Sequence, residues 1–328
     1  MKAIPRDKIP DAIAVLRRKY KIVAPVGKGG GWSFSVVEGP QTVQIDYTTT
    51  ILPLKKFFLP TNEAMLKYNI ATQEAREEEH KTEPTLFFGI HNYEMQGLLR
   101  LDHAFLSGVK DPAYLSRREK CAFVGVSYQP DEFHFADSVG IPSSLKEGFD
   151  VFLTRCDDCY RLEALTKAGA AIEADLASLL VERELPADAV VFFKNKLKQS
   201  VAGIREVFHG AYANPVWTET AKKCLSCGTC NIVCPTCYCF DVDDNTALGS
   251  THGERLRLWD SCQFTSFTTV AGGEAFREKR TDRVRHRMSR KFAFVSDDKG
   301  RPFCVGCGRC VRQCAAKISI TDVMNALL

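Results

Sequence analysis

Continuous apolar runs and helically spaced apolar residues alternate along the first half of the chain. Short apolar runs bounded by polar residues are typical of buried strands, and a spacing of three to four residues indicates an amphipathic helix. We expect strands over residues 85–90, 122–127 and 149–153, and helices over 10–21, 93–106 and 113–120. Strands that alternate with helices indicate an α/β layered domain.

The other N-terminal segments have weaker patterns. Gly29, Gly30 and Gly31 lie between two expected strands, 21–26 and 32–37. A glycine run suggests a phosphate loop, but no G-K-[ST] follows and no helix begins there, so a hairpin turn is favoured. We also expect a strand over 42–46, an extended connector over 51–60, a helix over 61–68 and a charged surface segment over 73–83.

Two cysteine runs share the spacing C-x2-C-x2-C-x3-C. The first is Cys224, Cys227, Cys230 and Cys234, followed by Pro235, and the second is Cys304, Cys307, Cys310 and Cys314, followed by Ala315. Cysteines at every third position present three thiolates to one cubane, and the fourth ligates the other cluster in two-cluster proteins. We therefore predict two [4Fe–4S] clusters. Cluster 1 is assigned to Cys224, Cys227, Cys230 and Cys314, and cluster 2 to Cys304, Cys307, Cys310 and Cys234.

Zinc sites and disulfides are the alternatives for these runs. Zinc sites normally use separated pairs of ligands, and disulfides need an oxidising compartment. Repetition of the same four-cysteine spacing favours iron–sulfur clusters over both.

The segments around these runs have helical periodicity. It extends over 161–209 almost throughout, and residues 263–270 and 274–291 are also helix-like. We therefore expect an α/β scaffold or docking domain over 1–183. A helical linker and a mostly α-helical, ferredoxin-like domain with two clusters would follow over 184–328.

Composition excludes several classes of protein. Of 328 residues, 45% are hydrophobic and 26% charged, which is ordinary for a soluble globular protein. A net charge of +4, without basic residues interleaved with aromatics, does not favour nucleic-acid binding. The N-terminus lacks an apolar signal core, and no run is long enough for a membrane span. Fourteen cysteines then indicate metal chemistry in a reducing compartment, and we predict a cytoplasmic protein.

Six cysteines lie outside the two runs. Cys156 and Cys159 form a C-x2-C with only Cys121 and His134 as evident extra ligands, and acidic Asp157-Asp158 between them raises thiol pKa values. We favour reduced, non-ligating thiols there over a metal or redox role. Cys237, Cys239 and Cys262 are expected to pack as small apolar residues, with an additional ligand set as the alternative.

The densest basic run is Arg283, Arg285, His286, Arg287, Arg290 and Lys291. It has three interpretations: it raises a cluster's reduction potential, binds an acidic partner, or forms a solvated helix face. Nearby charge tunes cluster potentials, so the first interpretation has a physical basis.

Nearly the whole chain resembles an iron–sulfur subunit family. That family includes the β subunit of cytoplasmic NiFe (sulf)hydrogenases and the A subunit of anaerobic sulfite reductase. The strongest resemblance lies in the first cysteine run with its continuation to Val242, then in Trp259-Asp-Ser-Cys-Gln-Phe264, Arg277 and 283–291. Residues 25–30 and 52–57 also resemble the family.

The resemblance implies an electron-transfer subunit. Its partners would be a flavoprotein subunit that handles NAD(P)H and a catalytic oxidoreductase subunit. No nucleophile elbow, dinucleotide fingerprint or zincin motif indicates a catalytic site in this chain. The alternative is a self-sufficient iron–sulfur reductase with substrate bound in the N-terminal domain.

The chain departs from the family in its N-terminal half. Many members carry extra cysteines there, consistent with a third metal site. This chain has Gly89-Ile-His-Asn-Tyr-Glu94, Ser127-Tyr128 and Phe133-His134-Phe135 at the corresponding places. If those cysteines hold a cluster in relatives, we expect this chain to have lost it.

Overall fold

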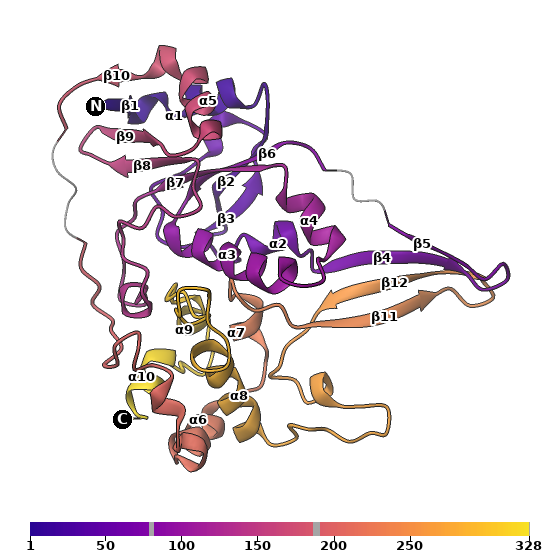
Figure 1. Ribbon diagram of the computed structural model, residues 1–328. Helices are drawn as coiled ribbons and strands as arrows, with labels where there is room; N and C mark the ends of the chain where they lie inside the picture. Colours follow the sequence, from indigo (N-terminus) through magenta and orange to yellow (C-terminus); the bar gives the residue numbers. More distant parts are fainter. Residues whose placement is uncertain (79–81, 186–190, 328) are drawn as a thin grey trace.

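The computed structural model describes residues 1–78, 82–185 and 191–327. Its N-terminal half is built on a mixed sheet with strand order β10-β1-β9-β8-β7-β6-β2-β3 (Figure 1). The strands are β1 (Lys2–Pro5), β2 (Lys21–Lys28), β3 (Gly31–Val36), β6 (Thr85–Ile90), β7 (Cys121–Val126), β8 (Val151–Arg155), β9 (Cys159–Ala164) and β10 (Val181–Glu182).

The centre of this sheet is parallel and buried. Strands β2, β6, β7 and β8 pair in parallel, and antiparallel strands complete both edges. Phe87 on β6 stacks on Phe123 of β7 at 5.3 Å between ring centroids. Strands buried on both faces are near-continuous apolar runs, which explains why the sequence pattern predicted β6, β7 and β8.

A second sheet forms an arm that projects from the body (Figure 1). It has the order β11-β12-β4-β5, with β4 (Asn62–Asn69), β5 (Glu74–Glu77), β11 (Phe240–Thr246) and β12 (His252–Trp259). Strands from residues 62–77 and 240–259 thus join in one sheet. This sheet crosses the division expected at residue 183.

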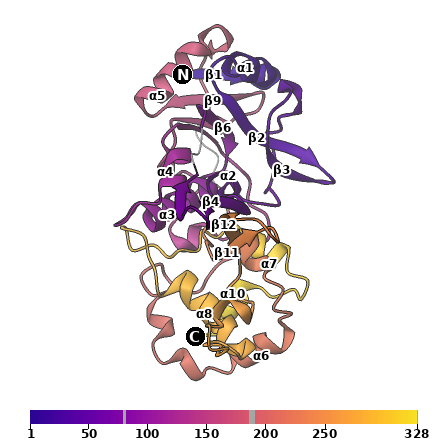
Figure 2. The same ribbon diagram turned by 90° about the vertical axis from the view of Figure 1, so that its right-hand side faces the viewer.

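The helices of the N-terminal half are α1 (Ile9–Leu16), α2 (Lys55–Phe58), α3 (Asn92–Leu106), α4 (Pro112–Arg118) and α5 (Lys167–Asp175). Those of the C-terminal half are α6 (Val216–Lys223), α7 (Thr229–Ile232), α8 (Arg280–Phe292), α9 (Arg309–Arg312) and α10 (Ile320–Asn325). Figures 1 and 2 show α3 between the large sheet and the C-terminal helices. None of the helices in the described ranges is long and apolar enough to cross a membrane.

The α/β architecture of the N-terminal half is confirmed. Helices α1, α3 and α4 and strands β2, β3, β6, β7 and β8 occur where they were expected, within a few residues. Gly29 and Gly30 have positive φ and join β2 to β3 in an antiparallel hairpin, as predicted.

Several local predictions are wrong. Residues 61–68 form strand β4 and not a helix, because they pair with β12 from the distant second half. Residues 42–46 contribute only an isolated bridge, at Val43, and α2 interrupts the expected connector. The charged segment lies at the surface, as predicted, where residues 74–77 form the exposed strand β5, and residues 79–81 lie outside the described part.

The C-terminal half is less helical than expected. Residues 161–209 contain β9, α5, β10 and short 3-10 turns, with 186–190 outside the described part. Residues 266–268 make a 3-10 turn, and the helix expected from 274 begins at Arg280. The expected fold class is confirmed, but the cluster domain is not clearly mostly α-helical, because long loops and the β11–β12 hairpin fill much of it.

Candidate iron–sulfur centre

The two cysteine runs fold into matching loops. Gly228 and Gly308 occupy the same place in each run, have φ of 74° and 71°, and precede α7 and α9. Two residues earlier, Ser226 and Gly306 also have positive φ, of 54° and 64°. A left-handed backbone is costly for residues with a Cβ, so the glycines are suited to these tight turns. The runs thus share a backbone path as well as a spacing.

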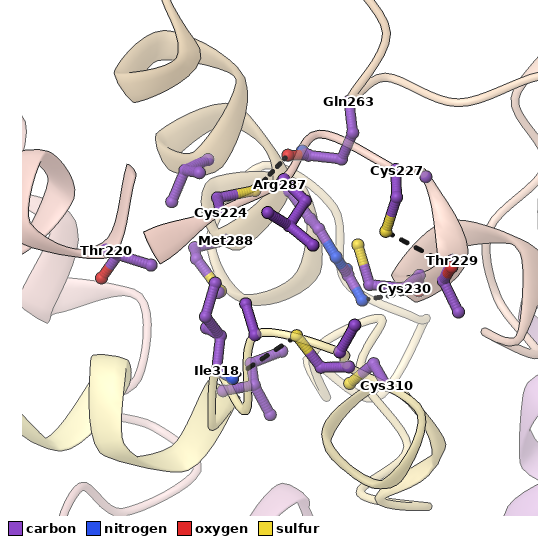
Figure 3. Close-up of a pocket in the computed structure, with 17 residues that line it drawn as sticks. Thr220, Cys224, Cys227, Thr229, Cys230, Gln263, Arg287, Met288, Cys310 and Ile318 are labelled. Atoms are coloured by element: carbon purple, nitrogen blue, oxygen red, sulfur yellow. Dashed lines mark hydrogen bonds between the residues drawn. The ribbon is translucent and has the colours of Figure 1, made fainter. Parts of the chain in front are cut away.

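The first run surrounds a cavity of about 60 Å³. Its wall includes five cysteines: Cys224, Cys227, Cys230, Cys310 and Cys314 (Figure 3). Backbone N–H groups point at two of the sulfurs, since Ser226 donates to Cys224 Sγ and Ile318 donates to Cys314 Sγ, each at 3.4 Å. Hydrogen bonds to the sulfurs are one of the features that set the potential of an iron–sulfur cluster.

A second cavity lies beside the first. Its wall includes Cys234, Cys304, Cys307 and Cys310. Cys234 of the first run therefore faces cysteines of the second run, and Cys314 faces those of the first, while Cys310 lines both cavities. The predicted crossed ligation is compatible with this arrangement.

The thiols surround spaces and do not converge on one point. In the part of the chain that the structure describes, no three His, Cys, Asp or Glu side chains are grouped as a single metal ion would need. The two cavities instead offer the cysteine donors that a cubane takes, four thiolates each.

Helix α8 carries a row of buried cations, two of which, Arg287 and Lys291, line the cysteine cavities. Arg283, Arg287 and Lys291 follow at intervals of four residues, and their exposed fractions are 5%, 5% and 2%. Arg287 donates to the Cys230 carbonyl at 2.8 Å, and Lys291 donates to Thr236 Oγ1 at 2.7 Å. The interpretation of the basic run as a solvated helix face is wrong for these three side chains.

Buried cations need anions close by, because an unpaired buried charge is very costly. Within the described residues, Arg283, Arg287 and Lys291 have no carboxylate partner. Burial would lower the pKa of Lys291, but the thiols of Cys234 and Cys237 raise it above its usual value. Thiolates and the anionic clusters that they hold are therefore the fitting counter-charge, and these residues fit iron–sulfur clusters.

Lys55 brings a further cation from the N-terminal half. It lies on α2 and donates to the carbonyls of Asn231 and Cys237 at 3.1 and 2.8 Å, with its Nζ 4.2 Å from the Trp259 ring centroid. Burial lowers its pKa to about 8. Sequence reasoning assigned Lys55 no role, although it lies in a segment that resembles the family.

Helix α3 joins the two halves of the molecule. Glu94 on α3 pairs with fully buried Arg309, which follows Cys307 and Gly308 and also donates to the Thr50 carbonyl at 2.7 Å. A Cβ added at Gly97 would lie 2.7 Å from Pro235, directly after Cys234. The cysteine loops are thus packed against α3.

Comparison with known proteins agrees with this geometry. Residues 223–318 match the family of 4Fe-4S dicluster domains. Sulfhydrogenase 2 subunit beta of Pyrococcus furiosus is 35% identical over an aligned length of 328 positions, and the alignment includes 96% of this chain and 95% of that protein. The chain belongs to the sulfhydrogenase beta subunit family. No solved structure matches it.

Aromatic side chains from residues 89–94, 127–128 and 133–135 lie together in the structure. Tyr93 and Tyr128 make an edge contact at 5.1 Å between centroids, and both contact His134, at 5.3 and 5.4 Å. His91 stacks on Tyr128 at 4.7 Å, and Phe135 is buried beside them. These positions, distant in sequence, form one packed aromatic cluster. That this chain has lost a third cluster at these positions stays a prediction.

The C-x2-C pair in this family member lies away from the cysteine loops. Cys156 and Cys159 form the turn between β8 and β9, where Cys156 N–H donates to the Cys159 carbonyl at 2.9 Å. Cys121 begins the neighbouring parallel strand β7 and so lies near the opposite end of the sheet. The pKa of Cys156 is raised, chiefly because it is partly buried and not because of Asp157 or Asp158. That Cys156 and Cys159 are non-ligating stays a prediction.

Proposed function

We propose that this chain is the electron-transfer subunit of a multi-subunit oxidoreductase. It would relay single electrons between a flavoprotein subunit that handles NAD(P)H and a catalytic subunit of the hydrogenase or reductase type. The observation that carries this proposal is the pair of adjacent cysteine-lined cavities that share Cys310. Two [4Fe–4S] clusters supply one-electron carriers at such sites.

The protein's own residues would hold and tune these carriers. We propose Cys224, Cys227, Cys230 and Cys314 for one cluster and Cys304, Cys307, Cys310 and Cys234 for the other, as the cavity walls support. The cations Arg287 and Lys291 lie within the same walls. A nearby cation stabilises the more negative, reduced form of a cluster, so these residues would ease electron entry.

The need for partners follows from what the chain itself offers. The Pyrococcus furiosus relative is named as a subunit. The sequence of this chain has no motif that indicates a flavin site or a catalytic site. Residues 1–183, which include strands β4 and β5 of the arm, would serve as the docking scaffold. Residues 184–328 would carry the clusters. All fourteen cysteines are free, which suits a reducing compartment, and we propose the cytoplasm.

A reduction experiment tests this proposal against the self-sufficient reductase. The anaerobically purified chain should be bleached by a strong artificial reductant but not by NADH or NADPH. Adding the flavoprotein subunit should let a nicotinamide reduce the clusters, which stopped-flow absorbance reports. Direct reduction of the flavin-free chain by nicotinamide, or turnover by the isolated chain, would exclude a purely electron-transferring role.

A further inference from the structure

A third group of cysteines lies beside the two runs. Cys237, Cys239 and Cys262 all line one open cavity of about 320 Å³ next to α8. Cys237 and Cys239 follow the first run, whereas Cys262 follows β12, so the fold brings together residues more than twenty positions apart. A backbone hydrogen bond of 3.0 Å from Asp260 to the Cys239 carbonyl fixes the two segments together.

One buried amide serves two of these sulfurs. Asn231 is 1% exposed, and its Nδ2 donates to Cys262 Sγ at 3.0 Å and to Cys239 Sγ at 3.7 Å. Cys237 and Cys262 are themselves buried, at 8% and 4% exposed. Such an amide orients the sulfurs toward a shared space and stabilises negative charge on them.

The surroundings of this cavity are strongly cationic. Its wall includes the cations Arg287, Arg290 and Lys291, and Lys55 lies nearby, where it donates to the Cys237 carbonyl. Arg287 lines this cavity and both cavities of the cysteine runs. No carboxylate lines the third cavity among the described residues. Packing of the three thiols as small apolar residues accounts for their burial but not for the buried amide that donates to two of the sulfurs.

We propose that Cys237, Cys239 and Cys262 hold a third iron–sulfur cluster, whose corner without a cysteine ligand faces the open cavity. A disulfide would use two thiols and leave the third unexplained. A structural zinc site takes four protein ligands in a closed tetrahedron, whereas this cavity is open. Three thiolates and a cationic wall suit a polynuclear, anionic cluster with one corner left to water or a small anion.

This site uses none of the eight cysteines assigned to the other two clusters, although the Cys237 thiol is in hydrogen-bond contact with Cys234. Because Cys262 is a ligand of neither of those clusters, its variants test the third site separately from them. The third cluster would lie next to the second, because Cys237 follows Cys234 by three residues, and would extend the electron path toward the surface near Tyr238 and Phe267.

Iron and acid-labile sulfide counts on the full, anaerobically purified chain test the proposal. Three cubanes require about twelve irons and twelve sulfides per chain. Cys262→Ser should retain about eight of each, because it removes one cubane. Cys121→Ser is the matched control: its thiol lies on β7 and donates to the Arg117 carbonyl at 2.9 Å, so its count should stay that of the unmodified chain. Cys304→Ser should lose about four irons from a different cluster.

A second measurement starts from the unmodified chain. A cluster with one corner lacking cysteine loses that iron on oxidation: [4Fe–4S]²⁺ gives [3Fe–4S]⁺, Fe²⁺ and one electron, which ferricyanide accepts. The unmodified chain should therefore develop a [3Fe–4S]⁺ EPR signal that Cys262→Ser lacks and Cys304→Ser keeps. A count of about eight irons in the unmodified chain, an equivalent of zinc in place of the extra iron, or an EPR signal unchanged in Cys262→Ser would each overturn the proposal.

Discussion

Individual buried cations set the electrostatic environment of the cysteine-lined cavities. Arg287 is 5% exposed, lines three cysteine-walled cavities, and its Nη1 has no hydrogen-bond partner among the described residues. A guanidinium in that position is stable only if anions occupy the cavities around it. Replacing Arg287 by a neutral residue should therefore change the cluster reduction potentials more than it changes the fold.

We expect Arg287→Met to lower the cluster reduction potentials, because the reduced clusters lose a stabilising cation. A shift of about 59 mV corresponds to a tenfold change for one electron, and a shift of that order is expected. Arg285→Met is the control on the same helix, since Arg285 pairs with Asp282 and lies over the Tyr212 ring. EPR-monitored redox titration measures both. Equal potentials in the two variants would contradict a tuning role for Arg287.

His91 should make the stability of the protein fall at mildly acidic pH. It is fully buried and stacks on Tyr47 and Tyr128, and burial with nearby His134 and Arg309 lowers its pKa well below the usual value. Below about pH 6.5, His91 therefore binds a proton in the unfolded chain but stays neutral in the folded chain. Stability then decreases by up to about 1.4 kcal/mol per pH unit.

His91→Phe keeps a ring in the stack but does not titrate. It should cost about 1 kcal/mol at pH 7.5, because the Tyr93 hydroxyl loses its 2.8 Å contact with His91 and keeps only the Thr48 carbonyl. The difference should shrink toward pH 5.5. Thermal unfolding midpoints at both pH values check this. A constant difference between the variant and the unmodified chain would show that His91 does not carry the pH dependence.

At the scale of elements, the short helices α7 and α9 depend on the turns that begin them. Gly228 has φ 74°, and a Cβ there would lie 2.6 Å from Phe264 Cζ. Gly249, in the β11–β12 turn, has φ 78° with nothing within 4 Å. Substitution by alanine should therefore strain the backbone at both positions, but only at Gly228 would the added Cβ meet a neighbouring side chain.

Gly228→Ala should destabilise the chain more than Gly249→Ala and should reduce its iron content. Backbone strain costs about 1–2 kcal/mol in both, and overpacking adds about 1–3 kcal/mol only at Gly228. Thermal unfolding and iron assay of both variants measure the difference. Equal losses would mean that the surroundings of the Gly228 turn are more adaptable than the packing indicates.

At the scale of the whole molecule, the two cysteine runs are predicted to exchange ligands. Cys314→Ser should perturb the same cluster as Cys227→Ser, and Cys234→Ser the same cluster as Cys304→Ser. EPR spectra of the reduced variants distinguish the clusters. Spectra in which Cys314→Ser instead matches Cys304→Ser would refute the crossing.

Local sequence was sufficient to predict the structure of those segments whose conformation depends on their own residues. The cysteine spacing gave both runs and their equivalence, and the continuous apolar runs identified β6, β7 and β8, because a strand buried on both faces needs apolar residues throughout. The glycines between β2 and β3 marked their turn in the same way.

Tertiary structure decided what distant segments do to one another. Residues 61–68 have helical character, but pairing with β12 and the burial of Glu63 against Arg257, with Nε 3.1 Å from Oε2, make them a strand. Lys55, Arg287 and Lys291 look like ordinary surface cations in sequence, and only the packing of α2 and α8 around the cysteines buries them. Spacing along the chain specifies local turns and thiol geometry. Burial and charge pairing depend on contacts across the chain, which no local pattern contains.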